Sequence, residues 1–482
     1  MTTALPLPRS TPEAQGIPSE ALLAFVEAAE REACGLHSLM LLRHGQVIAE
    51  GWWAPASAER PHMLFSLSKS FTSTAVGLAI AEGRLNLDDA VPNFFPKDLP
   101  KRMSARWSEV RVRHLLSMST GHLKDTMERI RERRQGNWVK GILEQAPRRA
   151  PGTHFVYNNG ASYMLAAIIR QATGMNVREY LQPRLFAPLG IAEPPWETCP
   201  RGINCGGWGL SLRTEDIARF GQLYLQKGRW NGTQLLPEAW VEAATSVQIA
   251  NGNDPDSDWA QGYGFQFWRC RHGAYRGDGA FGQFCVVLPE QDTVLALTGG
   301  MADMQAALTL VWKHLLPEFA ADALAENATT HAQLTARLGA LSQTPQAGAA
   351  TAAIASAVSG REYAIEANPL GITSLVCAFE GGHSRLSFQD QRGRHTVEAG
   401  YGAWRYGETC LPAEARIPMP VAASGAWTDA NTYTAQLWYY ETPFCATLTC
   451  RFEGDAVTCG NRTNVSFGPT EGPPLVGKAC NG

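Results

Sequence analysis

Ser66 and Lys69 are the residues of this chain whose types and spacing are best suited to chemistry. They open and close the tetrad Ser66-Leu67-Ser68-Lys69. Side chains three residues apart on a helix share a face, so the Ser66 hydroxyl and the Lys69 amine can meet. A serine becomes a useful nucleophile at neutral pH when a neighbouring base or cation activates it. The tetrad therefore predicts an activated serine. The alternative is a surface helix start with a solvated lysine.

The residues that follow the tetrad predict a buried helix. The run from Phe71 to Ile80 is small and apolar on every side. A helix of this kind is typical of a central element that is packed on several sides. This setting favours the chemical interpretation of the tetrad over the surface alternative.

A second motif places a phenol and an amide near one another. Tyr157-x-Asn159 follows a turn at Pro151-Gly152 and precedes an apolar helix at 160–174. A phenol has an ordinary pKa near 10 and becomes a base only if a neighbouring cation favours the phenolate. Lys69 could supply that charge. The alternative is that Tyr157 is a turn aromatic and Asn159 a helix N-cap.

A third motif, Gly277 to Gln283, has the spacing G-x-G-x-x-G. A dinucleotide fingerprint needs a helix after these glycines, but 284–288 is expected to be a strand, so we reject that function. Glycines at a strand start allow close approach to the backbone. In a hydrolase the approaching group would be the substrate carbonyl, and a backbone N–H there could belong to an oxyanion hole.

The order of predicted elements indicates an α+β domain. A helix, a hairpin and a long helical block come first, and strands and a last helix follow. This order implies one antiparallel sheet completed by distant segments, with helices packed against it. The expected ranges are 19–33 (helix), 38–42 and 46–50 (hairpin), 66–245 (mostly helical), 263–268, 284–288 and 293–297 (strands), and 302–316 (helix).

The composition changes after about residue 320. The segment 321–360 is rich in Ala, Thr and Gln and is expected to be a helical linker. Beyond it the apolar pattern has a period of two, with roughly eight short strands separated by Gly, Asn and Asp turns. We therefore expect three parts: a domain at 1–320, the linker at 321–360, and an antiparallel β-sandwich or barrel at 361–482.

Composition also excludes several functions. The 482 residues carry a net charge of −3 without a basic block, so neither nucleic acid nor an anionic membrane surface is an expected partner. No apolar run reaches the ~18 residues that a membrane span needs. The first residues lack the pattern of a signal peptide, which favours a cytoplasmic protein. The eleven cysteines show no zinc-binding spacing; free buried thiols are favoured over a disulfide-braced, exported domain.

Together the three motifs resemble the serine hydrolases of the class C β-lactamase superfamily. That superfamily includes penicillin-binding proteins, family VIII carboxylesterases, D-aminopeptidases and aminohexanoate-dimer hydrolases. The resemblance covers about residues 10–317, and the stretches 114–121, 207–216 and 219–225 agree with it. It implies a β-lactamase-like α+β domain with an inserted helical subdomain, and relatives with an extra domain suggest a lipocalin-like barrel by analogy.

The resemblance also implies roles for individual residues. Ser66 would be the nucleophile that forms an acyl-enzyme, and Lys69 and Tyr157 would share the proton transfers. The backbone N–H groups of Ser66 and Ala280 would form the oxyanion hole, beside Gly279. Asn159 would orient Lys69 or a substrate amide. Neither a metal nor an organic cofactor is expected. Trp208, between two glycines, is either a pocket wall or a core residue.

One departure from the family pattern bears on the substrate. The third motif in β-lactamases and penicillin-binding proteins is Lys-Thr-Gly, whose lysine helps to bind the substrate carboxylate. Here Gly277 stands at the lysine position and Asp278 at the threonine position. An acid there disfavours an anionic substrate, although the adjacent Arg276 could compensate.

We therefore expect an esterase that acts on small molecules. The alternative is an amidase or D-amino-acid peptidase, including an oligoamide hydrolase. A β-lactamase or a slowly turning penicillin-binding receptor is less favoured. Assembly into a homo-oligomer is left open.

Overall fold

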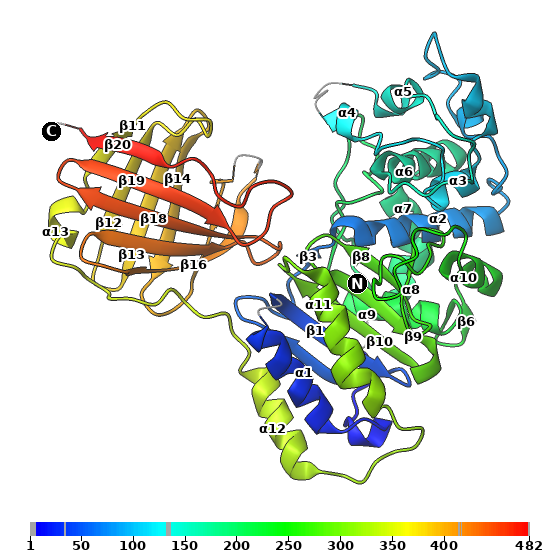
Figure 1. Ribbon diagram of the computed structural model, residues 1–482, viewed down its shortest axis with the longest axis horizontal. Helices are drawn as coiled ribbons and strands as arrows, with labels where there is room; N and C mark the ends of the chain where they lie inside the picture. Colours follow the sequence, from blue (N-terminus) through cyan, green and yellow to red (C-terminus); the bar gives the residue numbers. More distant parts are fainter. Residues whose placement is uncertain (1–5, 33–34, 132–135, 413–414, 416, 481–482) are drawn as a thin grey trace. The chain divides into compact units, whose positions relative to one another are not determined.

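The chain folds as two units, each described here by itself. The computed structural model describes residues 6–32, 35–131, 136–412, 415 and 417–480. The N-terminal unit comprises 1–51, 58–299 and 303–339, and the barrel unit comprises 52–57, 300–302 and 340–482. Figure 1 shows the elements of both units.

The N-terminal unit is built on a six-stranded sheet in the order β2-β1-β10-β9-β8-β7. Strands from the two ends of this unit meet at its centre, where β1 pairs antiparallel with β10 and Leu39 lies opposite Leu297. Every residue of β1, β9 and β10 is buried, which explains their continuous apolar runs. The strands are β1 (Leu36–Arg43), β2 (Gln46–Trp52), β7 (Trp268–Arg269), β8 (Tyr275–Gly279), β9 (Gln283–Leu288) and β10 (Thr293–Gly299).

Helices cover this sheet, so the expected α+β fold is confirmed. One helix, α9 (Thr214–Leu225), packs directly on β1, β9 and β10. A second group, formed by α1 (Ser19–Arg31), α11 (Met304–Leu310) and a π-helical turn (Val311–Leu315), packs together and lies over the sheet in Figure 1. The sheet therefore provides a rigid base for the residues at its edges.

The helical block surrounds one buried helix, α2 (Ser68–Ala81). Its neighbour α6 (Asn159–Thr173) packs on it and on α3 (Val112–Leu116). Gly77 is required on α2, because a Cβ there would overlap the indole of Trp240.

Shorter elements complete the N-terminal unit. The helices and helical turns are Glu13–Gln15, Phe65–Leu67 (a 3-10 turn), Val91–Phe94, Ala105–Glu109, α4 (Glu128–Arg131), α5 (Trp138–Leu143), α7 (Val177–Leu181), Gln182–Phe186, α8 (Ala187–Leu189), α10 (Glu238–Thr245), Pro289–Gln291 and Leu316–Glu318. The short strands are β3 (His62–Met63), β4 (Ser211–Leu212), β5 (Arg229–Trp230) and β6 (Thr233–Gln234).

The segment expected to be a linker is divided between the two units. Its first half contains α12 (Ala328–Gly339), which packs on α1. Asn327 Nδ2 donates to Glu20 Oε1 at 2.8 Å, and Arg337 forms an ion pair with Glu30. Its second half, with α13 (Ala355–Val358), belongs to the barrel unit.

The C-terminal part is a closed β-barrel, one of the two architectures that the period-two pattern predicts. Its described residues form ten strands in the order β14-β13-β12-β11-β20-β19-β18-β17-β16-β15, and a bridge between Gly400 and Ser424 joins β14 to β16. Aromatic side chains, including Tyr363, Trp427 and Phe452, fill its core. The strands are β11 (Glu362–Ile365), β12 (Ser374–Phe379), β13 (His383–Asp390), β14 (Gly393–Gly400), β15 (Arg405–Thr409), β16 (Met419–Trp427), β17 (Thr432–Trp438), β18 (Cys445–Glu453), β19 (Ala456–Thr463) and β20 (Leu475–Ala479).

Three further observations concern the chain as described. None of its helices combines the length and apolarity that crossing a bilayer requires. The ten cysteines among the described residues are free thiols, and eight of them are buried. Within the same residues, His, Cys, Asp and Glu side chains form no group of three or more that could hold a metal ion.

Candidate active site

Ser66 and Lys69 meet as their spacing predicts. Ser66 lies in the 3-10 turn Phe65–Leu67 that leads into α2, and Lys69 lies in the first turn of α2. Lys69 Nζ is 2.8 Å from Ser66 Oγ. The lysine is 2% exposed, whereas Ser66 is half-buried. A buried amine thus contacts a serine hydroxyl that a substrate can reach.

Two distant segments hold the Lys69 amine in place. Its Nζ donates to Asn159 Oδ1 at 2.8 Å and to the Gly207 carbonyl oxygen at 2.7 Å. These two acceptors use two N–H groups. The remaining position on the nitrogen faces Ser66, where an ammonium would donate and a free amine would accept. The geometry therefore suits Lys69 to exchange a proton with Ser66.

Tyr157 is the second group beside Ser66. The Ser66 side chain lies close enough to its hydroxyl to lower the pKa of the phenol, and Lys69 Nζ lies 4.8 Å from its ring centroid. The ring stacks on Trp268 with 5.5 Å between centroids and 20° between planes. Ser66, Lys69 and Tyr157 are therefore brought together from segments more than 80 residues apart.

The electrostatic surroundings of Tyr157 favour the neutral phenol. Burial and then the charge of Asp278 raise its pKa well above the ordinary value near 10, and the nearby Ser66 side chain opposes them. From the sequence, Lys69 is the neighbour expected to favour the phenolate. In the folded protein, Asp278 on β8 acts in the opposite direction, because its charge raises the pKa of Tyr157.

The backbone of β8 passes directly beside Ser66. A Cβ at Gly279 would overlap the Leu64 carbonyl oxygen and lie 3.1 Å from the Ser66 nitrogen, so only glycine fits. The next residue, Ala280, is half-buried, and its carbonyl accepts from Gln283 Nε2 at 3.1 Å. The turn that carries Ala280 is thereby tied to the start of β9.

Two phenylalanines with left-handed backbones flank this contact. Phe65, just before Ser66, has φ 47°, and Phe281, just after Ala280, has φ 67°. Their rings meet edge to face at 5.7 Å. Non-glycine residues in this region persist only where their surroundings hold them, and they concentrate at functional sites.

Asp125 contacts a residue of the site, although its place in the sequence, where it could reach the cleft, favours a solvated charge. Asn159 Nδ2 donates to Asp125 Oδ2 at 2.6 Å, while Asp125 Oδ1 accepts from the Met127 backbone at 3.0 Å. This contact turns the amide oxygen of Asn159 toward Lys69. The helix cap that we considered for Asn159 is made by Asn158, whose side chain accepts from the Gly160 nitrogen at 3.0 Å. No spacing rule links residue 125 to 159, so only the fold shows this pair.

Trp208 stands on the loop that binds Lys69. It follows Gly207, is half-buried, and lies 6.0 Å from Trp138 between ring centroids. Its carbonyl accepts from Trp196 Nε1 at 3.0 Å.

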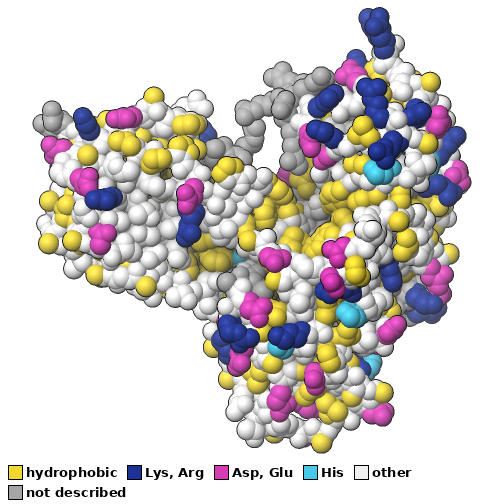
Figure 2. Space-filling model, viewed as in Figure 1, with side chains coloured by type: hydrophobic (Ala, Val, Ile, Leu, Met, Phe, Trp, Pro, Cys, Tyr) yellow, Lys and Arg dark blue, Asp and Glu magenta, His cyan; other side chains and the backbone are white. Residues whose placement is uncertain are grey.

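Figure 2 shows hydrophobic side chains lining a recess between the helical block and the sheet of the N-terminal unit, where α2 and β8 are neighbours.

The departure at the third motif has a structural explanation. A Cβ at Gly277 would lie 2.5 Å from Leu67 Cδ1 and from Ser70 Oγ, so a lysine does not fit there without rearrangement. Arg276 does not compensate as an exposed cation. It is fully buried, and its Nη2 lies 2.9 Å from Asp278 Oδ2.

Comparison with known proteins identifies the family. A family model described as Beta-lactamase matches residues 28–299, more than half of the 482 residues. The chain belongs to the β-lactamase family. The resemblance that the three motifs indicate is therefore confirmed, and with it membership of a family of serine hydrolases.

Named relatives of this β-lactamase-family chain differ in activity. It is 26% identical over 303 residues to a 6-aminohexanoate-dimer hydrolase of Paenarthrobacter ureafaciens, covering 58% of this chain and 76% of that protein. It is 26% identical over 349 residues to penicillin-binding protein 4 of Amycolatopsis lactamdurans, covering 63% of this chain and 86% of that protein. The octameric penicillin-binding protein homologue of Pyrococcus abyssi shares the fold, with a TM-score of 0.50 and 16% identity over 95% of this chain and 99% of that one.

Proposed function

We propose that this protein cleaves carboxylic esters of small molecules through an acyl-enzyme on Ser66. The observation that carries the proposal is the 2.8 Å contact of the Ser66 hydroxyl with Lys69 Nζ, beside the Tyr157 phenol whose pKa the Ser66 side chain lowers. A nucleophile needs an acceptor for its own proton, and the leaving group needs a donor. The two neighbours of Ser66 can supply one each.

In the acylation step, Lys69 acts as the base in its free-amine form. Ser66 Oγ attacks the ester carbonyl carbon while its proton moves to Lys69 Nζ. The carbonyl oxygen becomes an oxyanion that accepts from the backbone N–H groups of Ser66 and Ala280. When the C–O bond breaks, the Tyr157 hydroxyl gives its proton to the departing alkoxide.

The deacylation step returns the protons. The acyl-enzyme holds a Lys69 ammonium beside a Tyr157 phenolate, and each charge favours the other. Water attacks the acyl carbon as Tyr157 takes one of its protons. Ser66 Oγ then leaves and receives the proton from Lys69. The acid and the free enzyme result, with all three side chains in their starting states.

The site favours uncharged substrates. The third motif presents no lysine because Gly277 is packed against α2, and the charge of Arg276 is neutralised by Asp278 inside the protein. A substrate carboxylate would therefore lack the partner that the family's Lys-Thr-Gly motif supplies. This argues against β-lactam and penicillin-binding activity.

The second candidate is hydrolysis of an amide, including a linear oligoamide. Its support is the similarity to the 6-aminohexanoate-dimer hydrolase. The same three side chains would serve, but an amine leaves less readily than an alkoxide and depends more on protonation by Tyr157. Esters and amides therefore differ in how strongly they need this residue.

A substrate panel with burst kinetics tests the proposal. Purified protein would be mixed with p-nitrophenyl butyrate, ethyl butyrate, D-aminoacyl amides, a linear aminohexanoate dimer and nitrocefin. With p-nitrophenyl butyrate we expect a burst of one equivalent of p-nitrophenol followed by turnover. Mass spectrometry should show one butyryl group added to the peptide that contains Ser66. A burst without turnover would instead indicate a penicillin-binding receptor, whose acyl-enzyme is hydrolysed only slowly. Faster cleavage of the amides than of ethyl butyrate would replace the ester assignment by the second candidate.

A further inference from the structure

A buried ion pair on β8 lies next to the proposed site without contacting Ser66. Arg276 Nε and Nη2 each lie 2.9 Å from Asp278 Oδ2. The side chains of Arg276 and Asp278 are 0% and 6% exposed. Burying two charges costs desolvation that their attraction repays only in good geometry, so such a pair is weak evidence of a purely stabilising role. Its position invites a functional explanation.

One end of the pair reaches Tyr157 through a tryptophan. Trp268 lies opposite Arg276 in the pairing of β7 with β8, and its side chain is near enough to Asp278 to lower the pKa of that carboxyl. The same indole stacks on the Tyr157 ring, 5.5 Å away and 20° from parallel. Tyr263 meets both rings edge to face, at 4.8 Å from Trp268 and 6.5 Å from Tyr157. The phenol ring is therefore packed between two aromatic rings, and one of them, the Trp268 indole, lies near Asp278.

The other end of the pair is anchored in a buried network. Arg276 Nη1 donates to the Asp258 carbonyl oxygen at 2.7 Å, and its guanidinium lies 4.3 Å from the Trp259 ring centroid. The Asp258 carboxylate accepts from Gln305 Nε2 at 2.7 Å and from Trp312 Nε1 at 2.9 Å.

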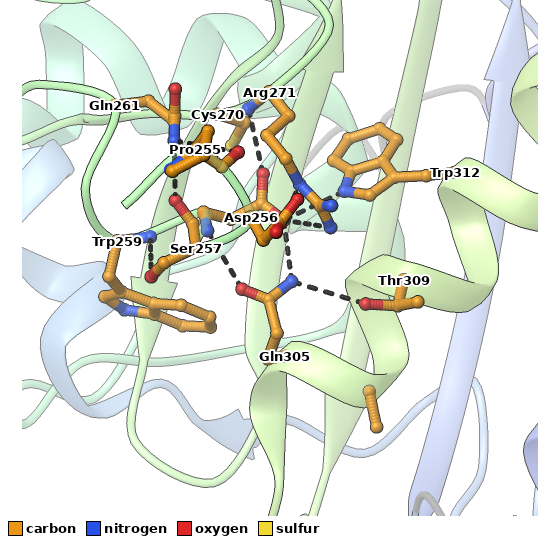
Figure 3. Close-up of polar contacts among 12 residues, drawn as sticks. Pro255, Asp256, Ser257, Trp259, Gln261, Cys270, Arg271, Gln305, Thr309 and Trp312 are labelled. Carbon is orange, nitrogen blue, oxygen red and sulfur yellow. Dashed lines mark hydrogen bonds and ion pairs between the residues drawn. The ribbon is translucent and has the colours of Figure 1, made fainter. Parts of the chain in front are cut away.

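Figure 3 shows how this anchor is assembled. Gln305 and Trp312 reach from α11 and the turn after it toward the loop that carries Ser257 and Trp259, and Arg271 reaches in from the strand side. Arg271 also binds the carboxylate of Asp258, with its Nη2 at 3.1 Å. Because Asp258 is fully buried and held by these partners, the carbonyl oxygen that accepts from Arg276 is fixed in position.

Charged and polar groups face Tyr157 from each element packed on it. Ser66 and Lys69 lie before and within α2, Asp125 precedes α4, and Arg276 and Asp278 lie on β8. Asp278 is the strongest of the charges that raise the pKa of Tyr157, while Arg276 lowers it. Loss of the Asp278 charge would leave the Arg276 cation uncompensated, and the phenol would then ionise at a lower pH.

We propose that the Arg276–Asp278 pair is a positioning unit for Tyr157, which fixes the phenol ring through Trp268 and keeps its proton in place until the leaving group takes it. The proposal rests on the proposed function, because it assigns Tyr157 the role of proton donor. Asp278 and Trp268 are positioning residues, since both act through Tyr157.

The test compares Asp278→Asn with a variant that breaks an ion pair of a similarly buried carboxylate in the barrel unit. In the barrel, Asp390 pairs with Arg392 two residues away, is 6% exposed and also contacts His395, so Asp390→Asn removes a similar buried carboxylate far from Ser66 in the sequence. Acylation would be followed by stopped flow with ethyl butyrate across pH. For Asp278→Asn we expect the acylation rate to fall by at least about tenfold and by less than the ~10²–10⁴-fold that a general acid or base contributes, with the substrate KM little changed. The alkaline limb of its pH profile should move to lower pH.

Two results would overturn the proposal. In the first, Asp278→Asn has the same acylation rate and pH profile as Asp390→Asn. In the second, Asp278→Asn changes the KM by the same factor as it changes the kcat. If Asp278→Asn does not fold, Trp268→Phe decides, because it keeps an aromatic ring on Tyr157 but loses the indole N–H near Asp278. Normal acylation by a folded Trp268→Phe would then reject the positioning role. Failure of the proposed function is distinguishable, because it would appear in the wild-type protein as the absence of a burst.

Discussion

The Gly207 carbonyl oxygen lies 2.7 Å from Lys69 Nζ, closer than the 2.8 Å of Asn159 Oδ1 and of Ser66 Oγ. A Cβ at Gly207 would lie 3.3 Å from the Ser162 Cβ and 3.5 Å from Lys69 Nζ, so the loop fits closely over the lysine. With Asn159 Oδ1 on a second side, the remaining direction of the nitrogen is toward Ser66. This arrangement explains how a flexible lysine can act at one defined atom.

Replacing Ser66 by alanine should abolish turnover of p-nitrophenyl butyrate and leave the melting temperature close to that of the wild type. Ser66 is half-buried, so the loss of one oxygen there leaves little cavity. Ser68→Ala is the matched variant, since Ser68 Oγ accepts from the Leu210 backbone at 3.1 Å instead of facing Lys69. It should still be acylated on Ser66. Wild-type turnover by Ser66→Ala would remove this serine as the nucleophile.

Replacing Tyr157 by phenylalanine should reduce the hydrolysis of ethyl butyrate by about 10²–10⁴-fold, the usual contribution of a general acid or base. The ring should still stack on Trp268, so the change removes the proton donor alone. Acylation by p-nitrophenyl butyrate should fall less, because its leaving group departs without a proton. Equal rates for Tyr157→Phe and the wild type with ethyl butyrate would exclude Tyr157 from proton transfer.

Asp125→Ala should lower kcat by up to about 100-fold, the effect of a small misplacement of a catalytic group. The reason is that Asn159 would lose the 2.6 Å contact that turns its oxygen to Lys69. Glu128→Gln is the control, because Glu128 is exposed and only three residues further on. Steady-state kinetics would compare the two, and similar values of kcat for both would reject the orienting role of Asp125.

Gly279→Ala should reduce activity about 100-fold or more, as loss of an oxyanion donor does, and should also lower the melting temperature. The added methyl group would overlap the Leu64 carbonyl and push β8 away from the Ser66 nitrogen. Gly407→Ala is the matched change, since nothing lies within 4 Å of its Cβ. An active Gly279→Ala protein would show that this backbone does not carry the oxyanion hole.

Stability should fall steeply at alkaline pH. Burial raises the pKa of several tyrosines, among them Tyr157, Tyr224 and Tyr275. Below the ordinary pKa near 10 these phenols are neutral in both states, so their contribution is complete. As the pH rises further, the unfolded chain releases the phenol protons while the native state retains them, which favours unfolding. Urea denaturation at pH 8 and pH 11 should show a lower midpoint at pH 11; an unchanged midpoint would contradict the prediction.

The sequence predicts local features of this protein well. The tetrad at Ser66, the α+β order of elements, and the change to a period of two near residue 361 depend on neighbours in the chain, and the structure shows their counterparts. The rejection of the dinucleotide function for Gly277–Gln283 also depends on local pattern, since β9 follows these glycines directly. Hydrophobic periodicity and motif spacing are properties of short segments, so they can be read from the sequence.

What the sequence alone determined is therefore the fold family and the motifs whose residues are the candidates for reaction. Only the tertiary structure decided their surroundings. It brought Asp125 to Asn159, turned Arg276 inward onto Asp278 and placed that acid near Tyr157. It also closed the C-terminal strands into a barrel through Gly400 and Ser424. The physical reason is that desolvation, charge pairing and sheet closure depend on contacts between residues far apart in the chain, which spacing along the sequence does not specify.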